Sequence, residues 1–219
     1  MKTMVYNKED LHRHLEELRP EGYVMNKYGQ FLKREENNDR TIMLTHGRVE
    51  RFPFGVNFSN FTVGVTFHPV ENIIHTVYKN HPDLRWGHDK TANTFGRSFS
   101  DRILGREIVL NNVYGVLVED DASFARVRPH LQTMQDAGLD FLRQHESLRD
   151  FHNLAETMQI EEMAGFYSQP LPVRRITVYK LMGLPYDDMA TALINKYAQR
   201  NELEKVAFVQ DLKTYLDNL

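Results

Sequence analysis

The sequence contains no cysteine among its 219 residues. This absence excludes disulfide bonds, thiolate metal ligands and cysteine nucleophiles at the same time. It is consistent with a reducing compartment, where disulfides are rare. Any catalysis or metal binding by this chain would therefore have to use histidines, carboxylates or hydroxyl groups.

Long apolar runs and an excess of basic charge are also lacking. No apolar stretch approaches the roughly 20 residues that span a bilayer, and the opening MKTMVYNKED turns polar before an export signal could begin. We therefore expect a cytoplasmic protein without a membrane partner. The net charge of −3 differs from the basic footprint of a nucleic-acid-binding domain, so nucleic acid is not expected as a partner either.

The composition is that of a folded domain. Apolar side chains make up 41% of the chain, with 13 Phe and 10 Tyr, which is enough to bury a core. The length lies within the range of one domain. We predict a single α+β domain over residues 1–219, sheet-rich over 1–119 and helical over 120–219, with an antiparallel sheet of about four to six strands.

The hydrophobic spacing predicts a short N-terminal helix. Leu11, Leu15 and Leu18 recur at i, i+4 and i+7, with Asn7 as a candidate N-cap and Pro20-Glu21-Gly22 as a stop signal. This helix opens the predicted fold.

Residues 23–68 change to short aromatic and β-branched segments, with turn chemistry at EENND and at THG. The clearest strand is NFTVGVTFH, where apolar and polar side chains alternate from Phe61 to Phe67. The preceding Val56 has the opposite parity. We therefore expect a bulge or a tight turn near Ser59-Asn60.

Pro69 starts a predicted helix in which apolar residues from Val70 to Tyr78 share one face. Glu71, His75 and Lys79 share the opposite face. We therefore expect these polar side chains to face solvent.

Everything beyond Asp121 is predicted to be helical. The run from Phe124 to Met134 steps by three or four residues, and Gly138 is expected to break it. Later helices are separated at GLPYDD and near QRNE. The charge pairs Glu161-Glu162 and Arg174-Arg175 are interpreted as solvated helix faces.

The stretch VYKNHPDLRWGHDK holds the only tryptophan and two of the ten histidines. Its His-Pro-Asp tripeptide is the signature of the J-domain, but the helix before it carries a single lysine and glycines interrupt the segment after it. We interpret the tripeptide as a turn. The four histidines of this region are six or seven residues apart rather than at the i, i+4 spacing of helical zinc pairs, so we predict no metal site. They are His68, His75, His81 and His88.

The same stretch begins a loop over residues 80–106, far longer than the usual connection of about four to six residues. Loops of this length often serve binding, and Trp, Arg and His are residues that anchor interfaces. The alternative is that Trp86 packs into the edge of the core and holds the loop in place. We predict a binding surface made of His75, His81, Arg85, Trp86 and His88.

Glu119, Asp120 and Asp121 come directly after the strand-like segment VYGVLV. Such acids could hold a divalent cation, as carboxylates do in phosphoryl-transfer sites. Acids at the start of a helix also cap its free N–H groups and complement its dipole, and we favour this capping interpretation.

A first helix ending in GY, the phrase FLKR, the strand VNFSNFTVGVTF and the phrase GLDFLRQHESLRDF succeed one another between residues 7 and 160. In this order they resemble a group of bacterial domains of unknown function, some of which occur beside toxin and immunity genes. The chain departs from that group in having VNFSN where the group has a glutamine-containing strand phrase. The resemblance implies a non-enzymatic bacterial protein and carries over no site residues.

The chain offers an ordered surface and no complete catalytic constellation. We therefore predict a protein-interaction domain, immunity-like in binding a partner protein, with no catalytic residues and no cofactor. The alternative is a metal-dependent hydrolase or phosphoryl-transfer enzyme that uses Glu119, Asp120 and Asp121 as ligands.

Overall fold

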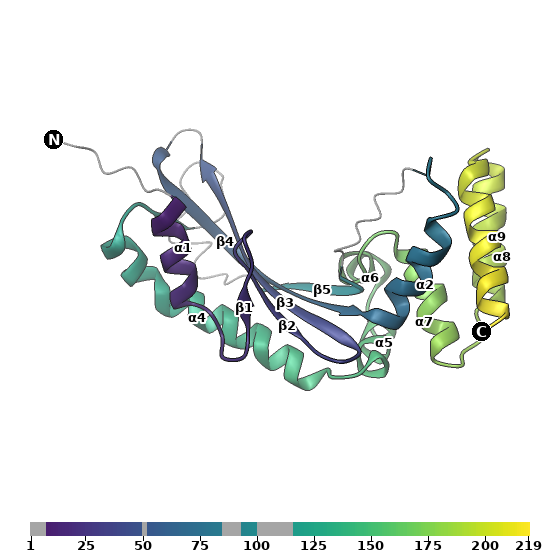
Figure 1. Cartoon of the computed structure of the whole chain (residues 1–219), viewed down its shortest axis with the longest axis horizontal. Helices are drawn as coiled ribbons and strands as arrows, with labels where there is room; N and C mark the ends of the chain where they lie inside the picture. Colours follow the sequence, from purple (N-terminus) through teal and green to yellow (C-terminus); the bar gives the residue numbers. More distant parts are fainter. Residues whose placement is uncertain (1–7, 50–51, 85–92, 100–115) are drawn as a thin grey trace. The chain divides into compact units, whose positions relative to one another are not determined.

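The computed structural model describes residues 8–49, 52–84, 93–99 and 116–219 of the chain. An N-terminal helix precedes a sheet, and helices make up the C-terminal half (Figure 1), which confirms the predicted α+β class. The elements are α1 (Lys8–Glu17), β1 (Val24–Met25), β2 (Gln30–Arg34), β3 (Asn38–Val49), β4 (Phe52–Phe67), α2 (His68–Tyr78), β5 (Phe95–Phe99), β6 (Val116–Val118), α4 (Asp121–Gln144), α5 (Leu148–Glu156), α6 (Ile160–Phe166), α7 (Leu171–Leu181), α8 (Asp187–Gln199) and α9 (Leu203–Asp217).

The described strands form one six-stranded sheet, within the predicted range. Its order is β1-β2-β3-β4-β5, and β6 pairs with β4. The pairs β1–β2, β2–β3 and β4–β6 are antiparallel, with Phe31 opposite Ile42 and Val56 opposite Val118. Successive strands along the chain are therefore neighbours as far as β5, as is usual in sheets.

One predicted turn is confirmed and another is wrong. The EENND turn lies between β2 and β3, at residues 35–37. The predicted turn at Thr45-His46-Gly47 lies instead inside β3, which continues to Val49. The β-branched residues Ile42, Thr45 and Val49 favour an extended backbone, which outweighs the turn preference of a single glycine.

β4 is continuous from Phe52 to Phe67, so the tight turn expected near Ser59-Asn60 is wrong. Val56 and Phe61 are both buried although they differ in parity. A strand covered on both faces buries both sets of side chains without reversing direction. The bulge that was the other alternative stays a prediction.

The chain divides into two compact units that interleave along the sequence. The first comprises Met1–Glu35, Asp39–Gly64 and Arg97–His145, and the second comprises Glu36–Asn38, Val65–Gly96 and Glu146–Leu219. The prediction of a single domain over 1–219 stays a prediction.

In the first unit, α4 is an unbroken helix of 24 residues, so the break expected at Gly138 is wrong. A Cβ atom at position 138 would lie 2.6 Å from Cγ1 of Val63 on β4. The glycine therefore serves the close approach of the helix to the strand rather than ending the helix. α1 packs beside α4, where the ring of His14 stacks on Phe124 at 3.9 Å.

The second unit contains a cluster of aromatic side chains around Phe95. Phe95 is fully buried, stacks on Phe151 at 5.1 Å and lies 4.6 Å from the ring of Tyr167. Phe67 and Phe166 contact the same ring. Phe95 belongs to the stretch over residues 80–106 that was predicted as a loop, and its burial anchors β5 in the core.

Two polar side chains predicted to face solvent are buried in this unit. Arg174 of α7 is 0% exposed, and its Nε and Nη2 lie 2.9 and 2.8 Å from the two carboxylate oxygens of Glu71 on α2. Thr94 donates a further hydrogen bond to Glu71. Helical periodicity does not reveal this pair, because each charge is tolerated inside only through a partner from a distant element.

Candidate functional site

The predicted binding surface is only partly covered by the described residues. His75 on α2 is half-buried, so the solvent-facing position expected for it is wrong. Glu71, one turn earlier on the same face, is buried, whereas Lys79, one turn later, is exposed as expected, so only the first part of this face of α2 is covered. Arg85, Trp86 and His88 lie outside the described residues, and the surface as a whole stays a prediction.

His81 lies three residues after the end of α2 at Tyr78. Its Nε2 lies 2.9 Å from Oδ2 of Asp211 on α9, and its ring meets Phe208 edge-on at 5.4 Å. The backbone N–H of Leu84 donates to the carbonyl of His81, at 3.2 Å. This hydrogen bond closes a turn with Pro82 at its second position, which confirms that His-Pro-Asp is turn chemistry.

The acids after β6 are engaged at the start of α4. Asp120 is the N-cap: its Oδ1 accepts from the backbone N–H of Ser123 at 2.8 Å, and Ser123 Oγ accepts from the backbone N–H of Asp120 at 2.9 Å. These hydrogen bonds lower the pKa of Asp120. The favoured capping interpretation is confirmed for this residue.

Asp121 joins α4 to α1. Its Oδ1 lies 2.5 Å from Nη2 of Arg13 and 2.9 Å from Nε2 of the buried His14, and these partners lower the pKa of Asp121. Glu119 is exposed. Across the described ranges, no three His, Asp or Glu side chains gather closely enough to hold a metal ion. The metal-dependent enzyme stays a hypothesis without a supporting contact.

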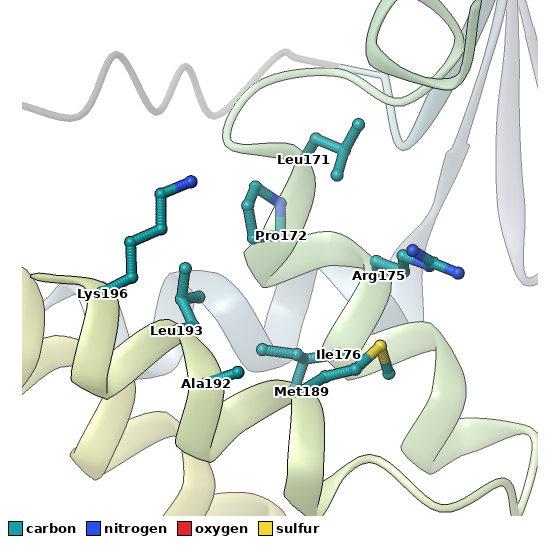
Figure 2. A pocket seen from close by; sticks show the side chains of 8 residues that line it. All are labelled: Leu171, Pro172, Arg175, Ile176, Met189, Ala192, Leu193 and Lys196. Atoms are coloured by element: carbon teal, nitrogen blue, oxygen red, sulfur yellow. The ribbon is translucent and has the colours of Figure 1, made fainter. Parts of the chain in front are cut away.

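A groove runs between α7 and α8 in the second unit (Figure 2). It encloses about 280 Å³. One wall comes from residues 171–176 of α7 and the other from residues 189–196 of α8. On each helix, the lining residues include pairs four positions apart. The lining residues are Leu171, Pro172, Arg175 and Ile176 from α7 and Met189, Ala192, Leu193 and Lys196 from α8.

Two cations flank this apolar lining. Figure 2 shows Arg175 and Lys196 on opposite sides, with the apolar side chains between them. Lys196 is exposed and forms no ion pair with any part of the chain that the structure describes. The groove therefore combines an apolar floor with an available positive charge at its rim.

Arg175 connects the groove to a polar cluster on α5 and α7. Its Nη2 lies 3.1 Å from both carboxylate oxygens of Glu156 and 3.1 Å from the hydroxyl of Tyr179. The ring of His152 meets Tyr179 edge-on at 5.0 Å. Glu156 thus compensates the charge of Arg175 at one wall of the groove.

Three buried polar atoms in and near this cluster have no hydrogen-bond partner among the described residues: Nδ1 of His152, the hydroxyl of Tyr167 and Nε of Arg175. Burial lowers the pKa of His152 and raises that of Tyr167. Buried polar groups of this kind normally have hydrogen-bond partners.

Sequence reasoning missed the groove and its cluster. Arg174-Arg175 was interpreted as a solvated face, yet Arg174 is fully buried and Arg175 is 25% exposed. A signal was present: apolar residues surround much of α7, with Val173, Ile176 and Val178 all buried. A helix with so wide an apolar surface needs cover on more than one side.

No protein-family model, curated protein or solved structure matches this chain. None of the helices in the described ranges is long and apolar enough to cross a bilayer. The resemblance to domains beside toxin and immunity genes stays a prediction. The candidate site is therefore defined by its own geometry.

Proposed function

We propose that the protein is an interaction module that docks a segment of a partner protein in the α7–α8 groove. The observation that carries the proposal is an apolar groove between two helices with a cation on either side. Burying apolar side chains is worth about 0.8 kcal/mol per CH₂ group, so a partner that fills the groove gains affinity from contact with its lining.

The lining favours binding over chemistry. Six of its eight side chains are apolar and the other two are cations, so the groove itself offers no carboxylate, hydroxyl or imidazole as a base or nucleophile. Cations at the rim of an interface steer partners of opposite charge and set specificity. The residues of the predicted loop surface, among them His81 and Trp86, are proposed as a further contact region of the same function.

The test places a charge on the groove floor. Ala192→Glu puts a carboxylate into the apolar lining at an exposed helical position, and Ala198→Glu makes the same change on α8 outside the groove. The tagged wild-type protein and both variants are used to capture partners from the organism that encodes the chain. Circular dichroism verifies that each variant is folded.

We expect the wild-type protein and Ala198→Glu to retain one stoichiometric partner and Ala192→Glu to lose it. Equal capture by all three proteins, or no stoichiometric partner at all, contradicts the proposal. An immunity-like role further predicts that the captured partner is a toxin encoded next to this gene.

A further inference from the structure

We infer that the groove accepts an amphipathic α-helix whose apolar stripe is flanked by acidic side chains, with Lys196 as the residue that sets the charge preference. This inference rests on the proposed docking function. It names the chemistry of the segment that docks.

The spacing of the lining residues matches a helical occupant. On α8, Met189, Ala192, Leu193 and Lys196 stand at i, i+3, i+4 and i+7, the stripe that one helix presents to another. At 1.5 Å per residue this stripe is about 10 Å long, or two turns. A third helix can lay its side chains between two such stripes, as ridges pack into grooves.

The chemistry of the lining disfavours an extended occupant. An extended segment carries backbone N–H and C=O groups that need partners when they are buried. The lining side chains include no hydrogen-bond acceptor beyond the weak sulfur of Met189. A helix satisfies its backbone internally and presents only side chains, so it can bury an apolar stripe here without that cost.

The flanking charges select acidic side chains on the occupant. Arg175 and Lys196 stand on opposite sides of the apolar lining, as charged residues flank the apolar seam between paired helices (Figure 2). Glu156 already compensates Arg175, whereas Lys196 has no ion-pair partner within the described ranges. The uncompensated charge at the groove is therefore that of Lys196.

The test uses synthetic peptides as probes. Peptides of roughly 16 residues, long enough for a measurable helix, carry leucines at i, i+4, i+7 and i+11. One version has glutamates beside the leucine stripe and a second has lysines there. A third has the composition of the glutamate peptide with its leucines scattered around the helix. Fluorescence anisotropy measures their affinity for the wild-type protein, Lys196→Glu, Ala192→Glu and Ala198→Glu.

We expect the glutamate peptide to bind the wild-type protein at least about tenfold more tightly than the lysine peptide, and Lys196→Glu to reverse this order. The difference should shrink at high salt, because the charges lie at the surface. Ala192→Glu should abolish binding of both peptides, and Ala198→Glu should not.

Three results with the peptides overturn the inference. The scattered peptide binds as well as the glutamate peptide, or Lys196→Glu leaves the preference unchanged, or no peptide shows binding that depends on Ala192. In the last case, capture of a cellular partner that still depends on Ala192 leaves the docking function standing and rejects the helical occupant. Concentration-dependent self-association that Ala192→Glu removes identifies the occupant as a second copy of this chain and also rejects it.

Discussion

Arg174 is the largest fully buried side chain in the part of the chain that the structure describes, and it is charged. Most of the hydrogen-bond donors of its guanidinium group have partners. The carboxylate of Glu71 accepts two hydrogen bonds, and the carbonyl of Ser168 accepts another from Nη1 at 3.1 Å. A buried pair of this kind adds little compared with apolar packing, but losing one partner leaves an uncompensated charge inside.

Glu71→Ala should therefore destabilise the protein by about 3–5 kcal/mol. Asp140→Ala is the comparison, because it breaks an ion pair with Arg143 in which both side chains are more than half exposed. Its cost should stay within about 1 kcal/mol. Urea unfolding at neutral pH measures both, and similar costs for the two variants would show that the buried pair is not a structural element of the second unit.

His152 makes stability depend on pH. Burial holds its pKa in the folded state below the ordinary value of 6.5, so the unfolded chain takes up the proton first as the pH falls. The stability contributed by the neutral ring is present above about 6.5 and is lost as the pH drops below this value toward the folded-state pKa.

We expect His152→Phe to flatten the fall in urea midpoint between neutral and mildly acidic pH. His130→Gln, at an exposed position of α4, is the control and should keep the wild-type pH dependence. An unchanged slope in His152→Phe would mean that other groups account for the acid sensitivity.

At the scale of elements, two glycines in helices have opposite requirements. Gly138 of α4 lies where a Cβ atom would meet Val63, whereas no atom lies within 4 Å of a Cβ built on Gly165 of α6. Alanine favours a helix over glycine by about 1 kcal/mol. Whether a Gly→Ala substitution stabilises the protein at each site therefore depends on whether the added Cβ atom clashes.

Gly165→Ala should stabilise the protein by about 0.4–1 kcal/mol. Gly138→Ala should destabilise it by about 1–3 kcal/mol, because overpacking displaces the helix from the strand. Thermal and urea unfolding of both variants test this, and a stabilised Gly138→Ala protein would contradict the close approach of α4 to β4.

At the scale of the whole molecule, the loop over residues 80–106 either forms a binding surface or stabilises the fold. We predict that Arg85, Trp86 and His88 serve a binding surface and are not needed for the fold. The free energy of unfolding of Trp86→Ala should then lie within about 1 kcal/mol of the wild-type value, whereas truncation of a tryptophan in the core lowers it by about 3–5 kcal/mol. Thermal unfolding of Trp86→Ala and of Arg85→Ala measures this, and both variants should remain close to the wild-type protein. A strongly destabilised Trp86→Ala protein would make the loop structural.

The sequence by itself determined those elements whose signals depend on local spacing and capping. The leucines at i, i+4 and i+7 predicted α1, Pro69 marked the start of α2, and Asp120 was expected to cap α4 as it does. Such signals depend on neighbours within one or two turns, which the sequence displays directly.

Tertiary structure alone decided which faces are covered. Glu71 and Arg174 are 103 positions apart, and only the packing of α2 against α7 turns two apparent surface charges into a buried pair. Gly138 lies inside an unbroken helix at a point where β4 approaches too closely for a Cβ atom. The groove combines residues of two helices, and no local pattern states which stripes of separate helices will face each other. Site geometry is a property of contacts between distant segments, and periodicity along the chain indicates which face of an element is apolar but not which segment covers it.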